Sequence, residues 1–258
     1  MADPLPPSGP PVTSVDEAIA RMQAIEQSLP AADGLACFNH MYLEVTQDVN
    51  SRLAQGYFSD PSFLSTLDTV FANIYFLAVD AVADPSKPAP AAWQPLMEAR
   101  SASGIYPIQF ALAGMNAHIN HDLPIALVQT CTQLETAPAD GSHHEDYQKV
   151  DALLDAAEQS VRQSFESGAA LQDDRHAQEV LDLVGNWSIN SARDVAWDTA
   201  LALWRSRGDP TVEVLIMSGL AHTVAMASRF LLVTPQREVR GRSLFDRVTR
   251  SIEVLVHG

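Results

Sequence analysis

The chain has 258 residues, of which 47% are apolar and 19% charged, a composition typical of a soluble protein with a substantial core. Its formal net charge of −16 at pH 7 argues against nucleic acids and anionic membranes as partners, because phosphate binding requires a basic surface. The sequence has no uninterrupted apolar run of about 18–20 residues and no basic-then-apolar leader at its start. We therefore expect a cytoplasmic protein with no membrane span.

Helical signals follow one another along the chain, whereas alternating strand patterns are almost absent. Residues 1–13 are rich in proline and are predicted to form a disordered arm. Ser14 and Glu17 have the spacing of a capping box. Asp60-Pro61 is a second start signal. Apolar periodicity predicts the following helices: Val15–Leu29, Leu35–Gln55, Pro61–Val82, Ala91–Arg100, Pro107–Asp122, Ile125–Leu134, Glu145–Glu166, Asp174–Val184, Ala192–Ser206, Val212–Leu232 and Ser243–Val256.

These patterns predict an all-α fold of roughly ten helices. Since no internal repeat is visible, the economical interpretation is one compact domain over residues 14–258. Residues 137–144 are predicted to be a solvated loop in which His143 and His144 are exposed.

One segment has the composition of a functional site. Two histidines, two asparagines and an aspartate occupy seven positions, 116–122, of an otherwise apolar stretch. In a helix, His118, His121 and Asp122 leave from one face. We predict these three as catalytic residues for acid/base chemistry, with the pKa of a histidine tuned by Asp122. Pro124 is expected to kink or break the helix just beyond them.

Further residues are candidates for binding the substrate. Arg193 and Trp197 are four apart, so a guanidinium stacked on the indole could clamp a carboxylate. The alternative is an aromatic core stripe in which Arg193 pairs with a buried acid. The predicted substrate-binding set is Gln109, Asn116, Asn120, Tyr42, Asn73, Arg193 and Trp197.

A metal site is the first alternative. His118, His121 and Asp122 could ligate a single zinc, iron or manganese ion, completed by His40, Glu44 or His222. Three ligands from one helical turn seldom suffice, and their spacing matches no familiar metal motif. The cofactor prediction is therefore none or one divalent metal.

Four elements of the sequence together resemble an uncharacterised bacterial family, known only as a domain of unknown function. The most specific is the stretch Gly114-Met115-Asn116-Ala117-His118-Ile119-Asn120-His121-Asp122-Leu123, and the others begin at Phe38, Phe71 and Ala192. The resemblance covers most of the chain after the proline-rich arm. It implies a self-contained helical domain and assigns no activity.

The sequence thus predicts an enzyme that acts on a small, mostly apolar molecule in a pocket between helices. Cyclisation, isomerisation and elimination are the reaction classes that such acid/base chemistry suits. Two alternatives stay open: a metal-dependent hydrolase or oxygenase at the same cluster, and a non-catalytic ligand-binding or interaction protein in which the cluster is a buried hydrogen-bond network. A homodimer is possible.

Overall fold

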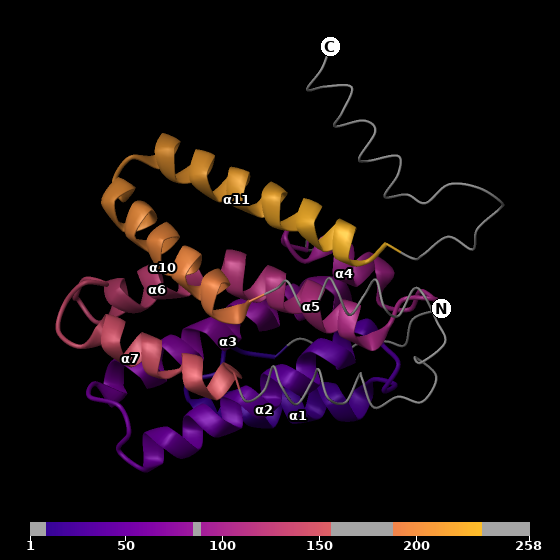
Figure 1. Ribbon diagram of the computed structural model, residues 1–258, viewed down its shortest axis with the longest axis horizontal. Helices are drawn as coiled ribbons and strands as arrows, with labels where there is room; N and C mark the ends of the chain where they lie inside the picture. Colours follow the sequence, from indigo (N-terminus) through magenta and orange to yellow (C-terminus); the bar gives the residue numbers. More distant parts are fainter. Residues whose placement is uncertain (1–8, 85–88, 156–187, 234–258) are drawn as a thin grey trace.

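The computed structural model describes residues 9–84, 89–155 and 188–233, and every regular element among them is a helix (Figure 1). The all-α prediction is confirmed. The predicted helix Asp174–Val184, the predicted helix Ser243–Val256 and residues 156–166 lie outside the described residues. The elements are α1 (Val15–Ser28), α2 (Gly34–Ala54), α3 (Pro61–Ala83), α4 (Gln94–Ala99), α5 (Pro107–Ala117), η1 (His118–Asp122), α6 (Leu123–Gln133), α7 (His143–Lys149), α10 (Ile189–Ser206) and α11 (Pro210–Leu231).

The two helix starts predicted from capping signals, Val15 and Pro61, are those of α1 and α3 in the structure. The Ser14 hydroxyl accepts a hydrogen bond from the Glu17 amide at the start of α1. The Asp60 carboxylate does the same for the Phe63 amide at the start of α3. Each cap satisfies an amide that has no partner within its own helix, which is why the chain becomes helical at these points.

One long helical segment, α5–η1–α6, runs through the middle of the molecule and is surrounded by the others. α5 lies between α2 and α11, while α6 lies against α3 and α10. Figure 1 shows α11 crossing above α5, with α10 joined to it at a sharp corner. Most buried apolar side chains of the described residues form one cluster that extends from Ala18 in α1 to Leu232 after α11.

Pro124 does not break this central helix, so the predicted break is wrong. The chain instead widens into the π-helical turn η1, in which the Leu123 amide bonds to the His118 carbonyl five residues back. Pro124 then falls in the first turn of α6, where its missing amide costs least. The π-turn carries all three residues predicted to be catalytic, and such turns occur often at functional sites.

Two glycines allow α2 and α5 to approach closely. A methyl group on Gly114 of α5 would overlap the Phe38 ring of α2, and one on Gly34 of α2 would overlap the Phe110 ring of α5. Each helix thus inserts an aromatic ring over a glycine of the other. The Phe38 ring continues from this contact into an edge-on contact with the imidazole of His118, whose ring centroid is 5.6 Å away.

We expect Gly114→Ala to lower the free energy of unfolding by about 1–3 kcal/mol, because the added methyl displaces a ring in a packed core. Chemical denaturation measures the change. Gly219→Ala is the matched control, since Gly219 is also helical but has no atom within 4 Å of the new methyl. The control should gain as much as about 1 kcal/mol from helix propensity. Equal changes in the two variants would contradict the close contact.

The loop predicted at residues 137–144 is partly wrong, because His143 begins α7 and is only 5% exposed. Its ring stacks on Phe63, with centroids 3.9 Å apart and an angle of 11° between the planes. Its Nδ1 contacts the Ala137 carbonyl at 3.0 Å. A surface of α3, which the sequence could not place beside this loop, therefore buries the histidine.

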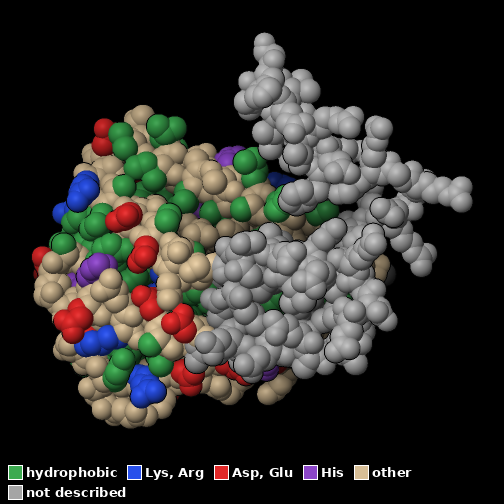
Figure 2. Space-filling view, viewed as in Figure 1, with side chains coloured by type: hydrophobic (Ala, Val, Ile, Leu, Met, Phe, Trp, Pro, Cys, Tyr) green, Lys and Arg blue, Asp and Glu red, His purple; other side chains and the backbone are tan. Residues whose placement is uncertain are grey.

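α3 and α11 are both long and apolar enough to cross a membrane by length and composition, although core helices pass the same test. In α3, 44% of the most apolar window is buried, against 22% in α11. Figure 2 shows hydrophobic side chains along the upper edge of the molecule, where α10 and α11 lie. The most exposed large apolar residues of α11 are Val214, Leu215, Met226 and Phe230, each at least 60% exposed.

Candidate functional site

The centre of the site is the carboxylate of Asp122, which is fully buried. Its Oδ2 accepts hydrogen bonds from Trp93 Nε1 at 2.9 Å and from His118 Nδ1 at 3.1 Å. Its Oδ1 accepts one from His121 Nδ1 at 2.7 Å. The π-turn supplies three of these four side chains, and Trp93 reaches in from the start of α4. The structure thus brings the three predicted catalytic residues together.

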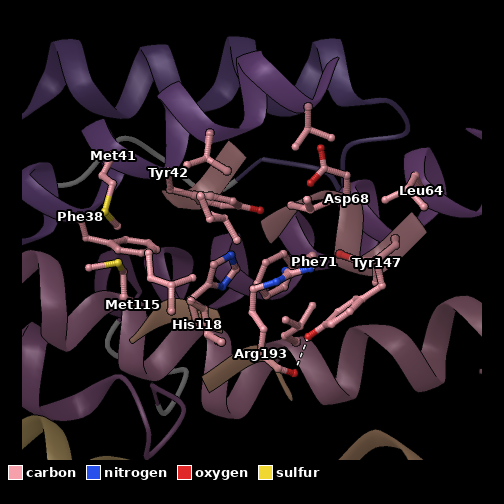
Figure 3. A pocket seen from close by; sticks show the side chains of 18 residues that line it. Phe38, Met41, Tyr42, Leu64, Asp68, Phe71, Met115, His118, Tyr147 and Arg193 are labelled. Carbon is pink, nitrogen blue, oxygen red and sulfur yellow. Dashed lines mark hydrogen bonds between the residues drawn. The ribbon is translucent and has the colours of Figure 1, made fainter. Parts of the chain in front are cut away.

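Of the three predicted catalytic residues, only His118 faces a cavity. His118 lines a cavity of about 80 Å³ between α2, α3, η1, α7 and α10, whereas His121 and Asp122 do not line it. Apart from Tyr42, Asp68, His118, Tyr147 and Arg193, the cavity is lined by apolar side chains. Figure 3 shows the His118 ring near the middle of the site, while the Tyr147 hydroxyl bonds to the Arg193 carbonyl at its edge. A mostly apolar cavity with a few converging polar groups is the usual form of a small-molecule site.

The polar groups of this cavity are incompletely satisfied. Tyr42 Oη, Asp68 Oδ2 and His118 Nε2 are buried and have no hydrogen-bond partner. They make up three of the five such side-chain atoms among the described residues. An unpaired buried polar atom costs about 1–3 kcal/mol, so three around one cavity indicate that a ligand or ordered water completes them.

The hydrogen-bond pattern determines the form of His118. Its Nδ1 faces a carboxylate, which can only accept, so Nδ1 carries the proton and the Nε2 lone pair faces the cavity. Burial lowers the pKa of His118, and the bond and charge of Asp122 only partly oppose this. The ring stacks on Phe71, with centroids 3.5 Å apart. His118 is therefore a neutral, rigidly held base.

The two carboxylates near His118 differ in their pKa. Burial alone would raise the pKa of Asp122, but the hydrogen bonds from His118 and His121 hold it below its usual value. Asp68 has no such donors, and burial raises its pKa to about 7 although the charge of Arg193 opposes the shift. Burial also holds the Tyr42 phenol well above its ordinary pKa, so it stays protonated.

Three of the predicted substrate-binding residues join α5 and η1 to α11 instead of lining the cavity. Asn116 Nδ2 donates to the Val224 carbonyl and to Ser228 Oγ, each at 2.9 Å. Asn120 donates to Asn116 at 2.9 Å, and Gln109 donates to the Leu231 carbonyl at 2.8 Å. Their polarity is explained by helix–helix hydrogen bonds.

The remaining predicted binding residues are divided. Tyr42 and Arg193 line the cavity, while Trp197 packs on the rings of His144 and Tyr147 outside it. Asn73 is also elsewhere: its side chain donates to the Val12 carbonyl at 2.9 Å and accepts from the Val12 amide at 2.8 Å. The end of the predicted disordered arm is therefore held against α3.

Arg193 is not the carboxylate clamp that was considered. Its Nε bonds to Asp151 Oδ1 at 2.6 Å and its Nη2 to the Tyr147 carbonyl at 2.6 Å. Its guanidinium lies 4.0 Å from the centroid of the Tyr147 ring, not on Trp197. The alternative prediction, an arginine tied to an acid within an aromatic cluster, describes this arrangement.

The three residues predicted to ligate a metal are bonded to one another. The Nδ1 atoms of His118 and His121 both bond to Asp122, so this carboxylate holds the two rings and only their Nε2 atoms could ligate a metal. His40 is exposed and contacts Glu26 and Glu44 on the outer face of α2, and His222 is exposed on α11. No group of three side chains suited to a metal occurs in the described part of the chain.

Two residues of the site were missed at the level of sequence. Asp68 lies between Leu64, Leu67 and Phe71 on the apolar face of its helix, and an acid at such a position was a visible signal. Trp93 carried no signal, because nothing in the sequence places the start of α4 beside η1.

Comparison with known proteins gives one match. The sequence profile of a family of unknown function, DUF5995, matches residues 15–234, so the chain belongs to that family. The resemblance stated from the sequence is confirmed. No curated protein and no solved structure matches the chain.

Proposed function

We propose that this DUF5995 member is an enzyme that binds a small, mostly apolar molecule in the cavity and uses His118 as a general base. The observation that carries the proposal is the His118 imidazole: its Nδ1 is held by a buried carboxylate and its unpaired Nε2 faces the cavity. A base oriented by a third group is a recurring catalytic arrangement.

The neighbouring groups supply complementary roles. The Tyr42 ring centroid lies 4.3 Å from that of His118, and its unpaired hydroxyl can donate to negative charge that develops as His118 takes a proton. Asp68 provides a carboxyl group that can orient the polar end of the substrate. Proton removal beside a hydrogen-bond donor suits cyclisation, isomerisation or elimination in a site shielded from water.

A non-catalytic binding protein would use the same cavity. Substitution of His118 distinguishes the enzyme from the binding protein, because only the enzyme needs His118 as a base. We expect His118→Asn to lower conversion of a substrate at least 100-fold, since general bases contribute about 10²–10⁴-fold. Asparagine keeps a donor for Asp122 and lacks the distal nitrogen. Conversion is measured by NMR in D₂O on a panel of small apolar compounds, so that rearrangement and exchange at carbon are both detected.

His121→Asn is the matched comparison, because His121 makes the same kind of bond to Asp122 but does not line the cavity. Its loss should be less than tenfold. If both variants lose the same fraction of conversion and the same amount of stability, the two histidines belong to a structural network. Conversion retained in His118→Asn would overturn the role of His118 as base.

A further inference from the structure

All three unpaired atoms of the cavity can accept a hydrogen bond, and of these groups the Tyr42 hydroxyl can also donate. His118 Nε2 can only accept, because its proton is on Nδ1. Asp68 Oδ2 accepts when the carboxyl group is ionised, and Tyr42 Oη can accept as well as donate. We propose that the ligand of this site is a primary ammonium ion on a short apolar body. The inference rests on the proposed function and names its substrate class.

An ammonium group matches these atoms in number and kind. It has three donors and no acceptor, and the cavity presents three buried polar atoms without partners. An alcohol has a single donor and would leave acceptors unpaired. A carboxylate has no donor and would place its oxygens against lone pairs.

The charges around the cavity favour the same class. Asp122 bonds to the side of His118 away from the cavity, and Asp68 lies in the wall. Among the described residues of the lining, the single cation is Arg193, which is already bonded to Asp151 and to the Tyr147 carbonyl. Three carboxyl groups, those of Asp68, Asp122 and Asp151, therefore lie in or beside the wall together with one guanidinium. Asp68 has no hydrogen-bonded cation of its own among the described residues, so a cationic ligand would compensate it and an anionic ligand would be repelled.

The walls and the volume limit the rest of the ligand. The rings of Phe38, Tyr42 and Phe71 line the cavity, and aromatic faces attract alkylammonium ions. The volume of about 80 Å³ is roughly half that of a ~150 Å³ apolar cavity that holds benzene. By the same proportion, the enclosed part of the ligand has about three non-hydrogen atoms.

The test compares butylamine, 1-butanol and butyrate at pH 8, with binding followed by ligand-observed NMR and by the ¹⁵N signal of His118 Nε2. We expect butylamine to bind at least tenfold more tightly than 1-butanol, and butyrate to bind more weakly than either. Asp68→Asn should abolish the preference for the amine and change the affinity for 1-butanol by less than threefold. Asp48→Asn, which removes an exposed carboxylate from α2, should change neither.

Butanol binding that equals or exceeds amine binding would overturn the ammonium proposal while leaving the cavity as a binding site. A preference for the amine that survives in Asp68→Asn would also overturn it, because the cation would then be recognised elsewhere. Failure of the proposed function is recognised separately, by conversion that does not depend on His118.

Discussion

Replacing Asp122 by asparagine is expected to lower the free energy of unfolding by about 3–5 kcal/mol. The Asp122 carboxylate is fully buried and accepts three hydrogen bonds, from Trp93, His118 and His121. Asparagine replaces one acceptor oxygen by an amide group that donates. At least one buried donor then faces another donor, and the remaining bonds lose the strengthening effect of the charge.

The measurement is chemical denaturation of both proteins between pH 3 and pH 8. The pKa of Asp122 is lowered in the folded protein from its ordinary value of 3.8. Its contribution is therefore complete above about pH 5 and is lost as the pH falls through the folded pKa, so the difference between the proteins should shrink only in acid. Asp48→Asn is the exposed control and should change stability by less than about 0.5 kcal/mol. A loss below 1 kcal/mol in Asp122→Asn would contradict the network.

The opposite result is expected for the second buried carboxyl group: Asp68→Asn should stabilise the folded protein at pH 8. Burial raises the pKa of Asp68 from 3.8 to about 7, so ionising it in the folded state costs free energy. This difference in pKa between the folded and unfolded states corresponds to a loss of stability of as much as about 4 kcal/mol at high pH. The gain will be smaller to the extent that the half-buried side chain reaches solvent.

The sign of the pH dependence distinguishes this explanation from a general packing effect. Between about pH 4 and pH 7 the folded protein binds more protons at Asp68 than the unfolded chain does, so its contribution to stability falls as the pH rises. The gain in Asp68→Asn should therefore grow from near zero at pH 4 to its maximum above pH 7. Denaturation midpoints at four pH values test this, and a gain that does not vary with pH would contradict it.

The two predictions together distinguish a residue that stabilises the fold, Asp122, from a residue that serves binding, Asp68. Asp122 stabilises the π-turn and orients His118, so its loss should damage the fold. Asp68 lacks partners and should destabilise the empty protein, which is the expected behaviour of a group retained for binding. The same Asp68→Asn variant is expected to lose the preference for amines, so stability and ligand recognition should change in opposite directions.

The failures of sequence reasoning have a common cause. Asn116 and His121 were grouped with His118 because all are polar and close in sequence, yet Asn116 bonds to α11 and His121 lies behind Asp122. Asp68 and Trp93 were not grouped with His118, because they lie fifty and twenty-five positions before it. Distance along the chain does not indicate which face of a helix meets a cavity.

The helical character of the chain, the starts of α1 and α3, and the cluster at His118 were determined by the sequence alone, because periodicity, capping and local composition act over a few residues. Tertiary structure decided what the cluster does. Packing of α2, α3, α7 and α10 around η1 turned the His118 Nε2 toward a cavity and brought Asp68 and Tyr42 to it. The same packing engaged other predicted site residues, such as Asn116 and Gln109, in hydrogen bonds between helices. Such contacts join residues far apart in the chain, and their burial, which sets the pKa of each group, exists only in the folded protein.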